Sequence, residues 1–116
     1  MGQLTTHVLD VARGRPGSGM QIDLFAVGEN REPIKSVTTN DDGRTDEALL
    51  LGDSFVAGGY ELVFHVGAYY SASGMALPDP PFLDDVTIRF GIAEPSQHYH
   101  VPLLTSPWSY STYRGS

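Results

Sequence analysis

Hydrophobic and polar residues alternate in short runs along this chain, and glycine or proline closes almost every run. The clearest run is YELVFHV at 60–66, and similar runs occupy 4–11, 20–27, 34–40, 84–92, 97–104 and 109–115. Because successive side chains of a strand point to opposite faces, these runs predict half-covered β-strands. The turn signals between them, such as Asp42-Gly43, are typical of an all-β sandwich of two sheets.

Helix signals are scarce. Residues 67–74 predict a single helical turn, and the prolines within 75–82 predict a loop, because proline cannot donate to a strand ladder. The segment 45–59 fits a short strand followed by a loop. No linker or internal repeat interrupts the pattern, so residues 1–116 are expected to form a single domain.

The composition excludes several classes of function. The chain has no cysteine, which removes disulfides, thiolate nucleophiles and cysteine-based zinc sites. A formal net charge of −7, with scattered Lys and Arg, argues against nucleic-acid binding. No apolar run approaches the roughly 20 residues that span a bilayer, and no signal peptide is visible. We therefore expect a cytoplasmic protein without nucleic-acid or membrane partners.

The alternation places three histidines on the outer face of one sheet. In the first run, Leu4 and Val8 form the natural core face, which leaves His7 outside together with Thr5. His98 and His100 are two residues apart and therefore share a face. In that run Tyr99 and Val101 are expected to point inward, and the outward positions are His98, His100, Pro102 and Leu104. A sheet face of histidine, threonine, leucine and proline indicates an interface more than a solvated surface.

Each of these residues also has a plain structural interpretation. A histidine in a strand is more often a hydrogen-bonding residue than a catalyst, and His65 lies in a core-like run with no companion polar group. Arg44 follows a turn glycine and could simply be solvated, as could Arg114. The His98/His100 pair could ligate zinc with His7 as a third ligand, although no carboxylate stands at clear ligand spacing. The GxSxG, HExxH and phosphate-loop motifs are absent from the sequence.

Three separated stretches together indicate a family. They are LTTHVLDVARGRPG near the start, TNDDGRTD in the middle and HYHVPLLTSPWSYSTYRGS at the end. In this order they closely resemble 5-hydroxyisourate hydrolases, the transthyretin-like enzymes of purine breakdown, from Leu4 to Ser116. The resemblance implies a transthyretin-type β-sandwich of two four-stranded sheets with one short helix. It also implies a homotetramer around a central channel, whose inner sheets would cover the unusual outer face.

The same resemblance implies which residues do the chemistry. The family's catalytic positions fall on His7, Arg44 and His100, and its terminal YRGS signature falls on Tyr113, Arg114, Gly115 and Ser116. His98 belongs to the same HYH stretch and is expected to line the substrate pocket with the tail. The implied reaction converts 5-hydroxyisourate into 2-oxo-4-hydroxy-4-carboxy-5-ureidoimidazoline, using water activated by histidine, with arginine stabilising the developing charge and with no cofactor or metal.

Three other functions compete with this hypothesis. A transthyretin-like carrier would bind an apolar ligand in the channel, but it should line that channel with apolar residues and lysine. A purely structural sandwich would leave the YRGS terminus and the three outer histidines without a purpose. A zinc hydrolase would lose activity when a chelator is added.

Overall fold

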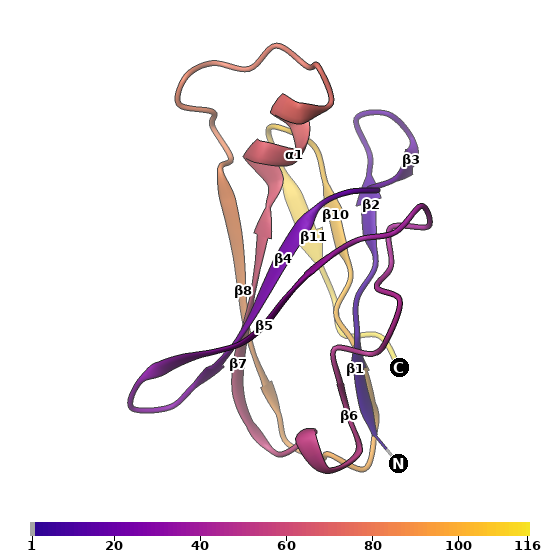
Figure 1. The fold of residues 1–116 in the computed structure, drawn as a ribbon, viewed down its shortest axis with the longest axis vertical. Helices are drawn as coiled ribbons and strands as arrows, with labels where there is room; N and C mark the ends of the chain where they lie inside the picture. The colour runs from indigo at the N-terminus through magenta and orange to yellow at the C-terminus, as the bar shows by residue number, and fades with distance from the viewer. Residues whose placement is uncertain (1) are drawn as a thin grey trace.

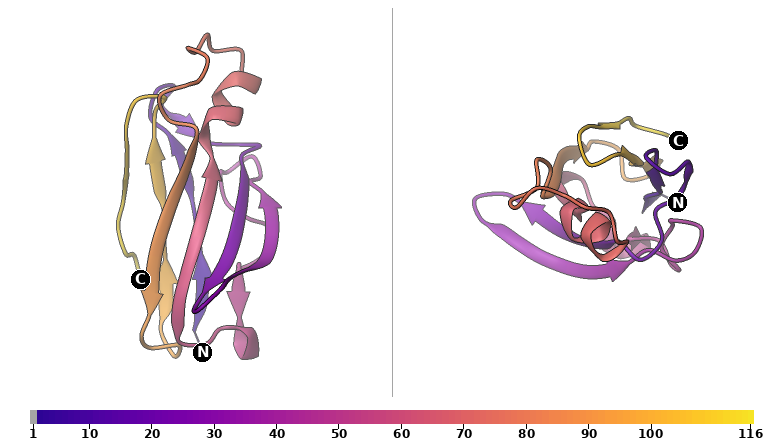
Figure 2. Two further views of the ribbon diagram at one scale, coloured as in Figure 1. Left: turned by 90° about the vertical axis from the view of Figure 1, so that its left-hand side faces the viewer. Right: turned by 90° about the horizontal axis from the view of Figure 1, so that it is seen from above.

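A computed structural model describes residues 2–116 and consists mainly of strands in two packed layers (Figures 1 and 2). The strands are β1 (Gln3–Thr5), β2 (Val8–Asp10), β3 (Arg15–Pro16), β4 (Gln21–Val27), β5 (Arg31–Thr38), β6 (Leu50–Leu51), β7 (Gly58–His65), β8 (Asp85–Ile92), β9 (His98–His100), β10 (Leu103–Thr105) and β11 (Tyr110–Thr112). One α-helix, α1 (Val66–Ala72), and one 3₁₀ turn, η1 (Gly52–Ser54), complete the fold. Among residues 2–116, no helix is long and apolar enough to cross a membrane.

The first layer is an antiparallel sheet in the order β5-β4-β7-β8. The predicted alternation of β7 is confirmed, because Tyr60, Leu62 and Phe64 belong to the hydrophobic core between the layers. The intervening positions, Glu61 and His65, therefore lie on the opposite face of this sheet. The sheet thus presents one apolar face to the core and one face that carries charged side chains.

The second layer consists of the sheets β6-β1-β9 and β11-β10-β2-β3. β1 runs parallel to β9, and β2 runs parallel to β10, in one constant register. The amides of Val101 and Leu103 continue this ladder by donating to the carbonyls of Thr5 and His7, both at 2.9 Å. The two sheets are therefore one interrupted layer, and the predicted sandwich of two layers is confirmed.

A side-chain hydrogen bond marks the interruption. The runs predicted as single strands at 4–11 and 97–104 are each divided in two, at Thr6–His7 and at Val101–Pro102. At this point the Thr6 hydroxyl donates to the Val101 carbonyl at 2.7 Å, so a side chain satisfies this carbonyl where the backbone pairing is interrupted. Pro102 has no amide proton, but the amides on either side of it still donate to the first run. Pro102 is also buried, whereas we expected it on the outer face. The chain end runs beside it, and Thr112 donates to the Pro102 carbonyl at 2.7 Å.

A buried carboxylate fastens α1 to the second layer. Asp10 is 1 % exposed and accepts hydrogen bonds from the hydroxyls of Tyr69 and Tyr70, at 2.7 and 2.8 Å. Burial and the Asp10 carboxylate raise the pKa of Tyr69 to about 12, so both hydroxyls remain donors at neutral pH. α1 is longer than the single turn expected from sequence, and it lies at the opposite end of the molecule from the N-terminus (Figure 1).

Candidate active site

Segments from the start, middle and end of the chain meet around a hollow of about 420 Å³ on the second layer. Four of the side chains that line it come from positions singled out in the sequence or beside them: Thr5, Arg44, His98 and His100. The loop 45–48 forms another wall, and the terminal Ser116 reaches the hollow as well. The parallel pairing of β1 with β9 is what brings residues 5 and 98–100 together.

The Thr5 hydroxyl stands between the two histidines of β9. Its oxygen lies 2.8 Å from Nε2 of His98 and 2.9 Å from Nδ1 of His100. The register explains this placement, because Thr5 is directly opposite His100 while His98 lies two residues along the same face. With Nδ1 bound to Thr5, His100 keeps Nε2 for other chemistry.

A tight turn positions Arg44. Gly43 has a φ of 74°, and its Cα approaches the chain so closely that an added Cβ would lie 2.4 Å from the carbonyl oxygen of Val8. The side-chain oxygen of Asn40 accepts from the amides of Asp42 and Arg44, at 2.9 and 3.2 Å. The turn that the sequence predicted at Asp42-Gly43 therefore delivers Arg44 to the edge of the hollow.

His7 contacts the same turn. Its Nε2 lies 2.8 Å from the carbonyl oxygen of Asp42, and its backbone forms an isolated bridge with Arg44. A carbonyl oxygen can only accept, so Nε2 of His7 carries a proton and Nδ1 is the basic nitrogen of the neutral ring. His7 does not line the hollow itself, but its charge contributes to the pKa of His100, which lines it.

The C-terminal tail packs on His100. Gly115 and His100 exchange two backbone hydrogen bonds, of 2.7 and 3.2 Å. A Cβ on Gly115 would lie 3.1 Å from Cβ and 3.2 Å from Cδ2 of His100, so a glycine allows this close approach. The next residue, Ser116, is thereby carried to the hollow.

Two of the predicted tail residues lie away from the hollow. The Arg114 guanidinium donates to the side-chain oxygen of Gln97 and to the carbonyl of His98, at 3.1 and 3.2 Å, and stands 4.2 Å from the centre of the Tyr99 ring. Tyr113 is 59 % exposed. In this single chain Arg114 therefore anchors the tail, and Tyr113 makes no contact with the hollow.

The electrostatic setting keeps His100 neutral. Burial lowers the pKa of His100, and the nearby charges of Arg44, His7 and His98 lower it further. A neutral imidazole near a guanidinium can accept a proton from water while the cation attracts a developing oxyanion. The arrangement is thus suited to hydrolysis of a polar carbonyl compound.

The structure corrects the expectation for His65. The sequence showed no companion polar group, yet two carboxylates flank the ring: Asp23 is 2.7 Å from Nε2 and Asp85 is 3.1 Å from Nδ1. Both partners come from neighbouring strands, β4 and β8, which the local sequence around His65 does not reveal. Over residues 2–116, no group of three or more His, Cys, Asp or Glu is arranged to hold a metal ion.

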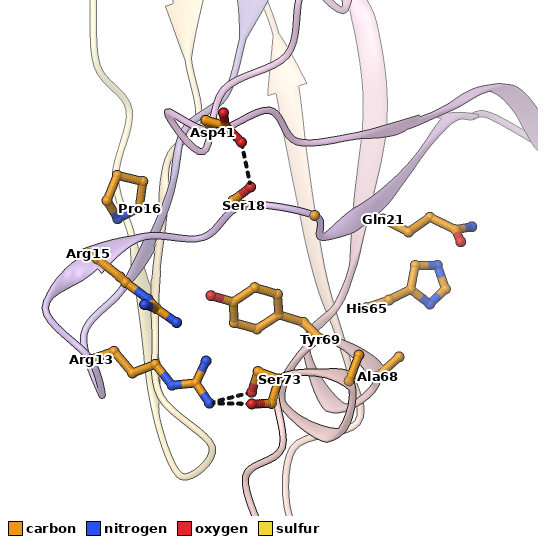
Figure 3. A pocket seen from close by; sticks show the side chains of 12 residues that line it. Arg13, Arg15, Pro16, Ser18, Gln21, Asp41, His65, Ala68, Tyr69 and Ser73 are labelled. Carbon is orange, nitrogen blue, oxygen red and sulfur yellow. Dashed lines mark hydrogen bonds between the residues drawn. The ribbon is translucent and has the colours of Figure 1, made fainter.

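A larger hollow, of about 730 Å³, lies between α1 and the segment 13–21 (Figure 3). Several of its polar groups bind protein partners. Arg13 donates to the carbonyl and hydroxyl of Ser73, at 3.1 and 2.6 Å, and the Tyr69 hydroxyl donates to Asp10. His65 also lines this hollow, but carboxylates contact both of its ring nitrogens and raise its pKa, so it offers no free basic nitrogen. The smaller hollow therefore remains the candidate active site.

The sequence pattern missed Thr5 and the acidic loop residues Asp46 and Glu47, all of which line the hollow. Thr5 was assigned to the same face as His7, and that shared face was the available signal. Its position between two imidazoles depends on the pairing of β1 with β9, which alternation within one strand does not specify.

Comparison with known proteins gives one consistent result. The model of the HIUase/Transthyretin family matches residues 4–115. The chain is 62% identical to a 5-hydroxyisourate hydrolase of Ralstonia nicotianae, with all of both chains covered. It is 58% identical to a 5-hydroxyisourate hydrolase of Pseudomonas aeruginosa, covering 100% of this chain and 93% of the relative.

Solved structures agree on the fold. The 5-hydroxyisourate hydrolase of Klebsiella pneumoniae matches with a TM-score of 0.82 and 34% identity over all of both chains. Sea bream transthyretin in complex with thyroxine matches with a TM-score of 0.86 and 26% identity, covering 97% of this chain and 94% of that one. (S)-allantoin synthase matches with a TM-score of 0.95 and 46% identity, and this chain covers 44% of its length.

Proposed function

The chain belongs to the HIUase/transthyretin family, and on that premise we propose that it hydrolyses 5-hydroxyisourate at the hollow formed by Thr5, Arg44, His98, His100 and Ser116. The observation that carries the proposal is the convergence of a neutral imidazole, a guanidinium and the chain end on one hollow. The full-length similarity to enzymes named for this reaction supports the same activity.

The reaction opens the six-membered ring of the substrate at a lactam bond. A water oxygen bonds to the carbonyl carbon while one of the water protons passes to an imidazole. A proton then returns to the ring nitrogen as the carbon–nitrogen bond breaks. Either Nδ1 of His7 or Nε2 of His100 can be the acceptor, because each is the ring nitrogen that no backbone or Thr5 contact occupies.

Arg44 and the tail act on the oxygens of the substrate. The Arg44 guanidinium stays charged at all relevant pH values and presents planar donors to carbonyl oxygens and to the oxyanion of the transition state. Ser116, which also lines the hollow, offers a hydroxyl to the ring. Gly115 holds the tail against His100, and Arg114 fixes its direction through Gln97 and the His98 carbonyl. No step requires a cofactor.

The active form is proposed to be a homotetramer. Large side chains are exposed beyond the hollow on the second layer and its loops, including Val11, Trp108, Tyr110 and Tyr113. β8 and β11 are edge strands, whose backbone groups can pair with another copy of the chain. The cytoplasmic location expected from sequence stays a prediction.

The direct test measures ultraviolet absorbance of 5-hydroxyisourate that urate oxidase has freshly produced. Catalytic amounts of the chain should accelerate its decay, and an Arg44→Gln variant of equal stability should not match that rate. Activity should survive treatment with a chelator, which separates the proposal from a zinc hydrolase. A folded protein that leaves the spontaneous decay unchanged would favour the carrier, and a ligand screen of the assembled channel would follow.

A further inference from the structure

The Thr5 hydroxyl is the feature of the hollow that the proposed function leaves without a role. Its oxygen is within hydrogen-bond distance of Nε2 of His98 and of Nδ1 of His100. We propose that Thr5 is a positioning residue that couples the two imidazoles, setting which nitrogen of His100 carries the proton and passing protons between the rings. This inference rests on the proposed function.

Counting protons shows why the coupling is necessary. A hydroxyl has one proton to donate, so Thr5 cannot donate to both imidazoles at once. If Thr5 donates its proton to one ring, the other ring can form a hydrogen bond with Thr5 only by donating an N–H to the Thr5 oxygen. The two neutral rings must then hold opposite states at the nitrogens that face Thr5.

The two arrangements give His100 opposite chemical abilities. When Thr5 donates to Nε2 of His98, Nδ1 of His100 carries a proton and donates to Thr5. Nε2 of His100 is then bare, and it can accept a proton from water. When Thr5 donates to Nδ1 of His100 instead, Nε2 of His100 carries a proton and can donate it to a leaving nitrogen.

A proton transfer through Thr5 connects these arrangements. After Nε2 of His100 has accepted a proton, the ring is an imidazolium with both nitrogens protonated. Its Nδ1 proton moves to the Thr5 oxygen while the Thr5 hydroxyl proton moves to Nε2 of His98. His98 becomes the imidazolium, Thr5 is again a neutral hydroxyl, and His100 is a neutral ring that retains its Nε2 proton for the leaving nitrogen.

The partners of the other threonines distinguish Thr5 from ordinary structural threonines. Five of them donate to backbone carbonyls, which is how a hydroxyl usually satisfies a strand or turn: Thr6, Thr39, Thr45, Thr105 and Thr112. Within residues 2–116, both hydrogen bonds recorded for the Thr5 hydroxyl go to imidazoles instead.

The surroundings favour a neutral His100, which both arrangements require. Arg44 lines the hollow and His7 contributes from the neighbouring turn, whereas the carboxylates of Asp46 and Glu47, which also line it, are not among the groups that shift His100. Burial and the positive groups lower the pKa of His100. A proton that His100 accepts is therefore held weakly, which favours its onward transfer to His98 or to the leaving nitrogen.

The first experiment reads the tautomers without using catalysis. Long-range ¹H–¹⁵N correlation spectra of the whole protein, in alkaline solution where imidazoles are uncharged, report which nitrogen of each ring carries its proton. We expect complementary states at the two nitrogens that face Thr5, and loss of that complementarity in Thr5→Val. Two bare nitrogens, or two protonated ones, in the unsubstituted protein would overturn the proposal.

The second experiment measures turnover in a matched set of variants. Thr5→Val should lower kcat by about tenfold or more, whereas Thr5→Ser, which keeps the hydroxyl, should stay within about threefold of the starting enzyme. Thr105→Val is the control, because it removes a fully buried hydroxyl whose partners are backbone carbonyls, and it should change stability more than kcat. Equal kcat in Thr5→Val and the unsubstituted enzyme would contradict the relay.

A double-mutant cycle separates a relay from two independent effects. If Thr5 acts through His98, then Thr5→Val combined with His98→Ala should cost little more than either change alone. If the fold-losses in kcat of the two single variants multiply in the double variant, the two residues act separately and the coupling is overturned. Absence of hydrolysis by the unsubstituted enzyme would remove the proposed function, while the tautomer spectra would still test the coupling.

Discussion

His65 and His100 lie on opposite sheets of one small domain, and their surroundings move their pKa values in opposite directions. Burial would lower the pKa of His65, but hydrogen bonds and charges from Asp23 and Asp85 outweigh it and raise that pKa. Burial also lowers the pKa of His100, and there the neighbouring charges of Arg44, His7 and His98 act in the same direction. The same side chain is thus stabilised as a cation on the first layer and as a neutral base on the second.

The comparison shows how charged partners determine what a half-buried histidine can do. An imidazolium between two carboxylates has no lone pair to offer and joins strands β4, β7 and β8 electrostatically. A neutral imidazole beside a guanidinium keeps a lone pair available near neutral pH. We infer that only the second setting suits catalysis, and each of the following changes tests that division of roles.

Replacing each of the two histidines in its own variant should give the largest difference in kcat. His100→Gln should lower kcat by about a hundredfold or more, since it removes a general base from the hollow. His65→Gln should leave kcat within about threefold, because its partners lie on the other sheet. Initial rates of 5-hydroxyisourate decay, with circular dichroism to confirm folding, provide the measurement. Comparable losses of kcat in both variants would contradict the division of roles between His65 and His100.

Changing Arg44 should alter both the rate and its pH dependence. Arg44→Gln should lower kcat by roughly tenfold to a hundredfold through lost charge stabilisation. Because the Arg44 charge contributes to the lowered pKa of His100, its removal should raise that pKa. The acid limb of the residual activity should therefore move to higher pH, whereas Arg44→Lys should keep it near its original position. A limb that does not move in Arg44→Gln would mean that another group titrates there.

The tail closes over His100 and has no counterpart at His65. Deleting Ser116 should lower kcat/KM by about tenfold, because a hydroxyl that lines the hollow is lost. The midpoint of thermal unfolding should change little, since Ser116 is exposed. Ser116→Ala is the matched control that keeps the chain length. Parallel losses of rate and stability would assign the tail a structural role.

The ion pairs of His65 should stabilise the folded protein more at low pH than at high pH. The pKa of His65 is higher in the folded protein than in the unfolded chain. The stability that its ion pairs contribute is therefore fully present below about pH 6.5 and is lost as the pH rises through the folded-state pKa. His65→Gln should therefore cost up to about 1 kcal/mol in the free energy of unfolding at roughly pH 5, and less at roughly pH 9. Urea titrations of both proteins at the two pH values measure this. If His65→Gln costs more unfolding free energy at high pH than at low pH, the ion pairs do not stabilise His65 as a cation.

The two histidine sites also show how far the sequence could predict the molecule. Alternation placed Leu4 and Val8 in the core and His7 outside, and both hydrophobic side chains are fully buried. It placed His98 and His100 on one face, where they do share the Thr5 hydroxyl. These predictions succeeded because strand alternation is a local property of the backbone.

What the sequence could not supply is pairing between distant strands. The parallel register that sets Thr5 opposite His100, and the neighbours β4 and β8 that bring Asp23 and Asp85 to His65, join residues far apart in the chain. The break at Val101–Pro102 was missed for the same reason, since the Thr6 hydroxyl that donates to the Val101 carbonyl belongs to a distant segment of the chain. The roles assigned to the site residues stay predictions until the variants above are measured.

The smallest expected effect is the difference in stability between removing one or the other carboxylate that contacts His65. Asp23 lies 2.7 Å from the ring, its side chain is 19 % exposed, and it also accepts from Ser36 at 2.6 Å. Asp85 lies 3.1 Å from the ring and its side chain is 52 % exposed, so water screens its charge more strongly. Asp23→Asn should therefore cost about 1 kcal/mol of unfolding free energy near neutral pH, and Asp85→Asn only a few tenths.

Both changes remove a negative charge that raises the pKa of His65, so both should lower that pKa, with Asp23→Asn lowering it more. Although burial alone would raise the pKa of Asp23, its hydrogen bonds with Ser36, His65 and Gln21 lower it. Its contribution should therefore persist above about pH 4 and be lost only on further acidification. NMR titration of the His65 ring measures the shifts, and the His100 ring serves as the internal control. A shift of the His100 pKa in either variant would show that the two sheets are electrostatically coupled, and the separation of roles between the two histidines would fail.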